Sequence, residues 1–107
     1  MAHIKDKKIT ILRKISVPDG RGGSETTWEP LPGGENIWAY YRQTTGSEFY
    51  EAARANIREE AVFEINWRND IKAPMRILFR GKKYEITRVD DFEGYKQDQK
   101  IYAYTLD

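Results

Sequence analysis

The stretch MRILFRGKKYEITRV, residues 75–89, decides the fold class of this chain. Two runs rich in β-branched and aromatic side chains, residues 75–79 and 83–89, meet at the sequence RGKK. Such residues favour strands, and Gly81 supplies the turn because glycine readily adopts a positive φ. The stretch therefore predicts a β-hairpin, and with it an antiparallel sheet.

The same alternation of apolar and polar side chains recurs elsewhere. Four apolar side chains on one face predict a strand at residues 7–17: Ile9, Ile11, Ile15 and Val17. Further strands are predicted at residues 24–29, 37–44, 60–68 and 100–106. Six or seven short strands separated by Gly and Pro turns indicate a mainly β fold, a small antiparallel barrel or sandwich. At 107 residues, the whole chain (1–107) is expected to form a single domain.

One segment departs from this pattern. NIWAYYRQTTGSEFYEAARAN, residues 36–56, begins as a strand and continues as a helix. Thr45 and Glu48 have the spacing of a capping box. The apolar side chains that follow fall on one helical face: Phe49, Ala52, Ala53 and Ile57. Because so short a helix is marginal in water, we expect it to dock on the barrel and to be able to leave it for another surface.

Charge and composition limit the classes of function. The net charge is +1, which excludes a large basic field for nucleic acid. Residues 1–23 carry six Lys and Arg against two Asp, whereas residues 90–107 carry two Lys against five acidic residues. This asymmetry fits either ordinary solvated faces or head-to-tail docking between copies. The chain has no Cys, which fits a reducing cytoplasm, and shows neither a signal core nor an apolar run of membrane-spanning length.

Enzyme chemistry has little support in the sequence. His3 is the only histidine and there is no Cys, so no nucleophile and base pair is available. Asp90, Asp91 and Glu93 could in principle hold a hard cation, but they miss the EF-hand spacing and are better explained as an acidic turn. We therefore predict a protein that is not an enzyme, with no catalytic residue, no metal and no cofactor.

A nucleic-acid-binding barrel is the alternative function. Four cations and two aromatic residues gather at the hairpin: Arg76, Arg80, Lys82, Lys83, Phe79 and Tyr84. Aromatic rings beside cations can bind single strands by stacking. Solvated hairpin charges explain the same residues equally well.

The order of features along the chain resembles a known family. An ITILRK strand is followed by DGRGGSETTWEPL, by the IWAYYRQTTGSEFYEA junction, by FEINWRNDIKAPMRILFRGKKYEITRVDD and by a final IYAYTLD strand. The most characteristic elements are Trp38 and Ala39 followed by Gly46 and Glu48, and an RNDI turn combined with MRI and YEI strands. Together they resemble the head-tail joining proteins of long-tailed phages, also called head-closure, stopper or head-completion proteins.

This resemblance implies a structural protein of a bacteriophage or prophage. Members look like small β-barrels that assemble into an oligomeric ring below the portal and adaptor, close the DNA exit channel and provide a docking surface for the tail. The implied partners are other copies of the chain, portal or adaptor ring proteins, a tail completion or tail tube protein and, without sequence specificity, the phage DNA in the channel. The implied location is the host bacterial cytoplasm during assembly and then the head-tail interface of the virion. Whether the chain is a stopper or a neighbouring joining protein stays open, as does its oligomeric state in isolation.

The resemblance also implies site residues. The segment after the Trp-Ala strand is expected to face the channel or a partner: Arg42, Thr44, Gly46, Glu48, Phe49, Tyr50, Arg54 and Arg58. We expect Gly46 to be a hinge that lets this segment rearrange in the ring. Loop contacts are expected at Asp19, Arg21 and Ser24, and core anchors at Trp38, Trp67 and Tyr84. Whether the segment plugs the channel or docks a partner stays open.

Overall fold

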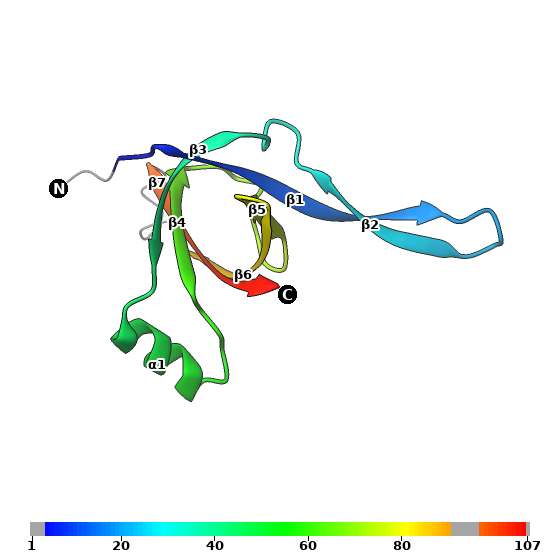
Figure 1. Cartoon of the computed structure of the whole chain (residues 1–107). Helices are drawn as coiled ribbons and strands as arrows, with labels where there is room; N and C mark the ends of the chain where they lie inside the picture. The colour runs from blue at the N-terminus through cyan, green and yellow to red at the C-terminus, as the bar shows by residue number, and fades with distance from the viewer. Residues whose placement is uncertain (1–3, 91–96, 107) are drawn as a thin grey trace.

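The computed structural model describes residues 4–90 and 97–106, which form seven strands and one short helix (Figure 1). The elements in chain order are β1 (Lys7–Pro18), β2 (Ser24–Pro30), β3 (Ile37–Gln43), α1 (Gly46–Arg54), β4 (Ala61–Asn66), β5 (Arg76–Phe79), β6 (Lys82–Asp90) and β7 (Asp98–Leu106). The predicted mainly β fold is confirmed, and the predicted strands differ from the observed ones by only a few residues at their ends.

Six strands close a barrel and one strand lies outside it. The sheet order is β2-β1-β3-β4-β7-β6-β5, and an additional pairing of β5 with β1 completes the barrel. All neighbours are antiparallel. Closure matters because a barrel leaves no strand edge of its own for uncontrolled pairing. Strand edges without a partner therefore lie on segments that leave the barrel.

The turn between β5 and β6 agrees with its sequence prediction. Arg80 and Gly81 have φ values of 51° and 77°. Two consecutive residues with positive φ are the mark of a type I′ hairpin turn, whose twist matches that of the strands it joins. Gly81 carries this conformation without the steric cost that a side chain would bring.

The barrel interior is filled by large apolar side chains at alternate strand positions. The largest of them are fully buried: Phe63, Ile9, Ile11, Ile65, Ile77, Ile86, Ile101 and Val62. The Phe63 ring lies 5.3 Å from the rings of Tyr41 and Tyr84 and 5.4 Å from that of Phe79, between centroids. Tyr84 lies in this core, as predicted.

The two tryptophans predicted as core anchors lie outside the core. Trp38 is 55% exposed, because strand alternation turns its neighbour Ala39 inward instead. The ammonium of Lys8 lies 4.7 Å from the centroid of the Trp38 ring. Trp67 is half-buried and follows the end of β4, so no strand orients it toward the interior. Both predictions are corrected.

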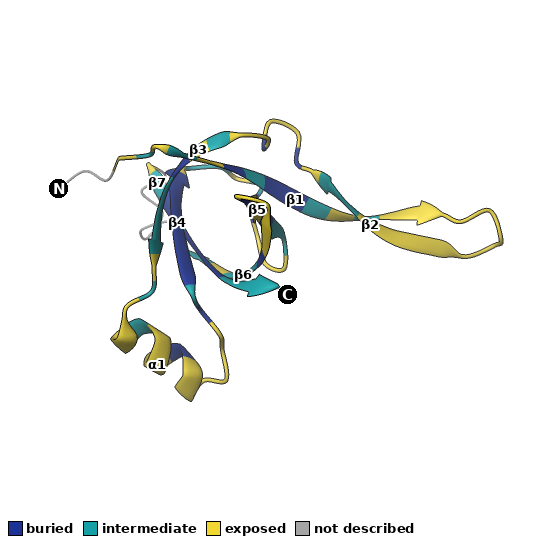
Figure 2. Cartoon of the chain, viewed as in Figure 1, coloured by how far each residue is buried: buried dark blue, intermediate teal, exposed yellow. Residues whose placement is uncertain are grey.

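The predicted strand at residues 7–17 is confirmed, but its apolar face is buried along only half of its length. Ile9 and Ile11 are buried, Ile15 is half-buried and Val17 is exposed. The reason is that Leu12 is the last residue of β1 that pairs with β5. After Leu12, β1 leaves the barrel and pairs with β2 alone. The resulting two-stranded arm projects into solvent, and Figure 2 shows that most of it is exposed.

Candidate interaction site

The predicted capping box begins α1. The Thr45 side chain accepts a hydrogen bond of 3.2 Å from the backbone N–H of Glu48, and a Glu48 carboxylate oxygen accepts one of 2.9 Å from the backbone N–H of Thr45. These two bonds satisfy backbone donors that the first turn of a helix leaves without partners.

A second local motif ends the helix, and the sequence analysis did not foresee it. Asn56 adopts a left-handed φ of 60°. Its N–H donates to the Ala53 carbonyl at 3.0 Å, and the N–H of Ile57 donates to the Ala52 carbonyl at 2.9 Å. This is the Schellman arrangement. Asparagine at this position is its sequence signal, since it tolerates the left-handed region better than most residues. Local capping at both ends therefore holds α1 together.

Packing on the barrel contributes little to α1. Among its residues only Ala52 is buried, whereas Phe49 is 41% and Tyr50 69% exposed, and Ile57 just beyond it is 41% exposed. The prediction that the Phe49 face docks on the barrel is therefore wrong. The reason lies in the strand register: β3 and β4 pair as far as Gln43 and Ala61, so the segment between them extends beyond the end of the barrel instead of crossing its wall (Figure 1).

A cleft separates the helix from the strands. It encloses about 250 Å³ between helix residues such as Glu51 and Ala52 and the barrel residues Glu59 and Arg88. Glu59 is buried and accepts hydrogen bonds from the Thr87 hydroxyl at 3.1 Å and from Arg88 Nε at 2.8 Å. The end of the segment is thus fixed on the barrel while the helix itself is held at a distance.

One ion pair ties α1 to β3. Arg42 donates from Nη1 and Nη2 to the two carboxylate oxygens of Glu48, at 2.7 and 3.0 Å. This bidentate geometry is the stronger form of a salt bridge. The hydrogen bonds from Arg42, helped by the Thr45 backbone, lower the pKa of Glu48 from 4.5 to about 2.

This ion pair makes the seating of α1 sensitive to acid. Because the folded-state pKa of Glu48 is lowered, the stabilisation is fully present above pH 4.5 and is lost as the pH falls through about 2. We expect the amide hydrogen exchange rate of α1, corrected for the intrinsic effect of pH on exchange, to rise as the pH falls through this window. The Glu48→Gln variant should show the faster exchange already at pH 7. Loss of the Arg42–Glu48 ion pair should lower the stability of α1 by about 1 kcal/mol, since the pair is partly exposed. Amide exchange in α1 that is unchanged by Glu48→Gln would show that this ion pair does not hold the helix.

The remaining predicted residues of this segment present little unpaired positive charge. Arg58 donates to Glu60 at 3.1 Å and lies 5.5 Å from the Tyr104 ring centroid. The Thr44 hydroxyl donates to the Glu59 carbonyl at 2.9 Å, which anchors the start of the segment. Arg54 is exposed in the last helical turn. The exposed character of residues 42–58 is therefore aromatic and apolar more than basic.

The predicted loop contacts lie at the tip of the arm. Asp19 accepts hydrogen bonds from the N–H groups of Arg21 and Gly23 at 2.8 and 3.2 Å, so its carboxylate closes the turn. Gly20 and Gly22 have φ values of 79° and 82°, which glycine adopts at the lowest steric cost. Arg21 and Ser24 are exposed at the tip.

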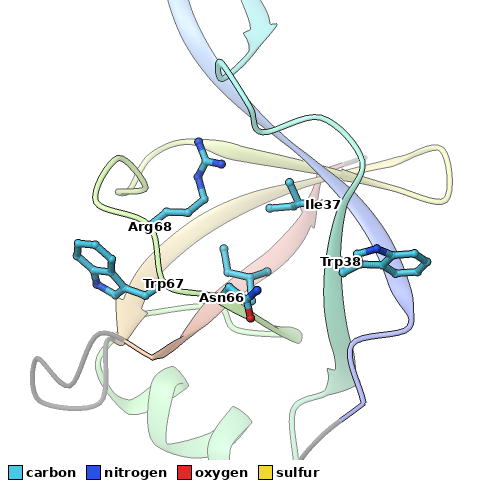
Figure 3. A pocket seen from close by; sticks show the side chains of 6 residues that line it. Ile37, Trp38, Asn66, Trp67 and Arg68 are labelled. Carbon is cyan, nitrogen blue, oxygen red and sulfur yellow. The ribbon is translucent and has the colours of Figure 1, made fainter.

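A third surface lies beside the exposed Trp38 and the half-buried Trp67 (Figure 3). A cleft of about 300 Å³ is lined by Ile37, Trp38, Ile65, Asn66, Trp67 and Arg68. Arg68 is fully engaged: it forms a bidentate pair with Asp70, at 2.9 and 2.7 Å, and donates to the Gly33 carbonyl at 2.8 Å. The RNDI turn is thus explained as a brace that joins two loops, and Arg68 also lowers the pKa of Asp70.

The hairpin proposed for nucleic acid lacks the arrangement that stacking requires. Phe79 and Tyr84 are 4% and 6% exposed, so both rings belong to the core. The Arg76 guanidinium lies 4.0 Å from the Trp28 ring centroid. The exposed cations of the hairpin therefore have no exposed aromatic partner on it.

Within residues 4–90 and 97–106, no group of three or more His, Cys, Asp or Glu side chains could hold a metal ion. His3, Asp91 and Glu93 lie outside the described residues. No helix in the described part of the chain is long and apolar enough to span a membrane.

These features define a small closed β-barrel from which a two-stranded arm and a helical segment project. The chain belongs to the phage head completion protein family, whose model matches residues 5–103. The resemblance found in the sequence is thereby confirmed, and membership implies a structural, non-enzymatic role in joining phage head and tail and a place in the virion.

The comparison with solved structures supports the fold. The solution structure of protein SF1141 from Shigella flexneri 2a is similar, with a TM-score of 0.76 and 21% sequence identity over 92% of this chain and 90% of that one. No curated protein sequence matches the chain.

Proposed function

We propose that this protein forms a ring below the portal and adaptor, closes the DNA exit channel after packaging and offers a docking surface to a tail completion or tail tube protein. The observation that carries the proposal is the projecting helix α1, which is held by its own caps and exposes Phe49 and Tyr50 to solvent. Exposed aromatic side chains of this kind are typical of protein contacts. Assembly would take place in the host cytoplasm, and the ring would remain at the head-tail interface.

Residues 42–58 are the segment that we assign to the channel or to a neighbouring subunit. Two of its three arginines are paired with carboxylates, Arg42 with Glu48 and Arg58 with Glu60. A contact with protein is therefore better supported than tight binding of DNA by this segment. Any contact with DNA in the channel would lack sequence specificity. The arm tip, with Arg21 and Ser24, would reach a different component.

The test is DNA release from packed, tail-less heads that lack this protein. Adding the purified chain should stop the release of DNA, and the added protein should be found bound at the portal vertex. Unchanged release without binding would overturn the proposal. The same preparation titrated with short DNA is expected to show almost no affinity, in contrast to the steep salt dependence that a nucleic-acid-binding barrel would give.

Gly46 offers a graded test of the rearrangement. A Cβ at this position would meet no atom within 4 Å, and the φ of Gly46 is not positive, so the described conformation does not require glycine. Thr45 has φ −72° and ψ 165°, which also permits proline at the first helical position. We expect Gly46→Ala and Gly46→Pro to keep or raise the melting temperature. The alanine should raise the free energy of unfolding by about 0.5 to 1 kcal/mol.

If Gly46 is a hinge, both variants should nevertheless retain DNA less well, with proline worse than alanine because it fixes φ. The measurement is the add-back assay beside thermal unfolding of each purified variant. Wild-type retention by the proline variant would show that no hinge operates at this residue.

A further inference from the structure

A notch lies at the root of the arm. Arg13, Lys14 and Trp28 from the arm and residues 72–75 from the loop before β5 enclose about 310 Å³. We call this the arm-root notch. None of the predicted site residues lines it.

The backbone beside the notch can accept another strand. The pairing of β1 with β5 ends at Leu12 and Arg76, and from Arg13 to Pro18 the described residues pair β1 with β2 alone. The edge of β1 that faced β5 therefore continues past the barrel without a strand. Such an edge is a template for strand addition, in which backbone hydrogen bonds supply affinity and nearby pockets select side chains.

The lining of the notch is both positively charged and apolar. Trp28, Pro74 and Met75 give it an apolar wall. Lys14 and Lys72 are exposed and form no salt bridge within the described chain. Arg76 lies over Trp28, and its Nε is buried without a hydrogen-bond partner. Glu29 forms a salt bridge with Arg13, with 2.6 Å between Arg13 Nη2 and Glu29 Oε1. Because Glu29 neutralises only Arg13, the notch keeps a positive charge. Its occupant should bring carboxylates and aromatic or apolar side chains.

This chain itself carries a segment of that chemistry. Residues 90–98, DDFEGYKQD, hold four carboxylates, two aromatic rings and a single lysine. Asp98 forms a salt bridge of 2.9 Å with Lys5, just before β1 begins, whereas the notch begins at Arg13. Eight residues of extended chain separate these points by about 26 Å. Asp98, the last residue of this segment, therefore lies away from the notch of its own copy.

We propose that the arm-root notch of one copy binds residues 90–98 of a second copy. The contact is head-to-tail, and such contacts form a ring when the rotation between copies closes. It pairs the basic beginning of one chain with the acidic end of the next. This inference rests on the proposed ring and identifies the surfaces that would build it.

The test uses the full chain and a synthetic peptide of residues 89–99, VDDFEGYKQDQ. Titration followed by amide chemical shifts should perturb Lys14, Trp28 and Lys72, and binding should weaken as salt is added. Lys72→Glu should weaken binding about tenfold or more, since it reverses a charge at the rim. The matched control is Lys82→Glu, an exposed lysine outside the notch. A peptide whose carboxylates are replaced by amides should bind little.

Two results would overturn the inference: no shift at the notch with millimolar peptide, or equal binding by Lys72→Glu and Lys82→Glu. The head assay separates this failure from that of the proposed function. If the wild-type chain stops DNA release but the peptide does not bind, the notch is not the ring contact and the function stands. If the peptide binds as described but heads still leak, the contact stands and the function is wrong.

Discussion

The double variant Phe49→Ser, Tyr50→Ser is expected to fold normally and to leave packed heads leaking DNA as if no protein had been added. Phe49 is 41% and Tyr50 69% exposed, and their rings contact each other edge-on at 5.9 Å. Because both side chains already touch water, their replacement should change the free energy of unfolding by about 0.5 kcal/mol or less. Their burial against a neighbouring protein would be lost entirely, and buried aromatic side chains are the usual source of binding energy at interfaces.

A matched control keeps this prediction specific. Leu78 is 37% exposed, close to the 41% of Phe49, and lies on the outside of β5, so Leu78→Ser removes an exposed apolar side chain from the barrel wall. We expect Leu78→Ser to stop DNA release like the unchanged chain. Full retention by the double variant would show that α1 contributes nothing to closure, and the arm would then be the surface to test. Thermal unfolding of both variants checks that the barrel is intact.

The strands could be predicted from sequence because each carries a local signal. The β5–β6 hairpin combines two apolar runs with Gly81, and the structure places that glycine at positive φ as the turn requires. Thr45 and Glu48 likewise gave the start of α1, since a capping box is a contact between residues close in sequence. Signals of this kind do not depend on where the rest of the chain lies.

The errors concern burial, which depends on the whole fold. The same alternation marks all of β1, yet only its first half lies over the barrel, because the closing contact with β5 ends at Leu12. Trp38 carries more apolar surface than Ala39, but the pleat allows only one of two neighbours to point inward, and that is Ala39. The apolar face of α1 indicates docking on the barrel, whereas the strand register carries the helix past the barrel end. Local pattern defines an element and its faces, and register decides which face is covered.

The candidate site shows the same division. The family resemblance predicts that residues 42–58 face the channel or a partner. The Arg42–Glu48 ion pair and the Schellman motif at Asn56 are seen only in the structure. The arm-root notch joins residues separated by more than forty positions, Trp28 and Lys72, and no sequence spacing indicates such a pair. Both surfaces exist because β1 and the β3–β4 connection continue beyond the closed barrel.

The last prediction concerns the barrel that carries both surfaces: Phe63→Ala should cost about 3 to 5 kcal/mol of stability. Phe63 is 0% exposed, and its ring meets Tyr41 of β3, Phe79 of β5 and Tyr84 of β6, so one side chain joins strands around the barrel. The loss is a large part of the 5 to 15 kcal/mol typical of a small domain, and it should lower the melting temperature by roughly 15 °C or more. Ile65→Val, on the same strand and equally buried, removes one methyl group and should cost only about 0.5 to 1.5 kcal/mol. Chemical unfolding of both variants measures the difference. Equal losses would mean that the aromatic cluster is not the centre of the core, whereas the expected order would show that closure of the barrel, and with it the positions of α1 and the arm, depends on Phe63.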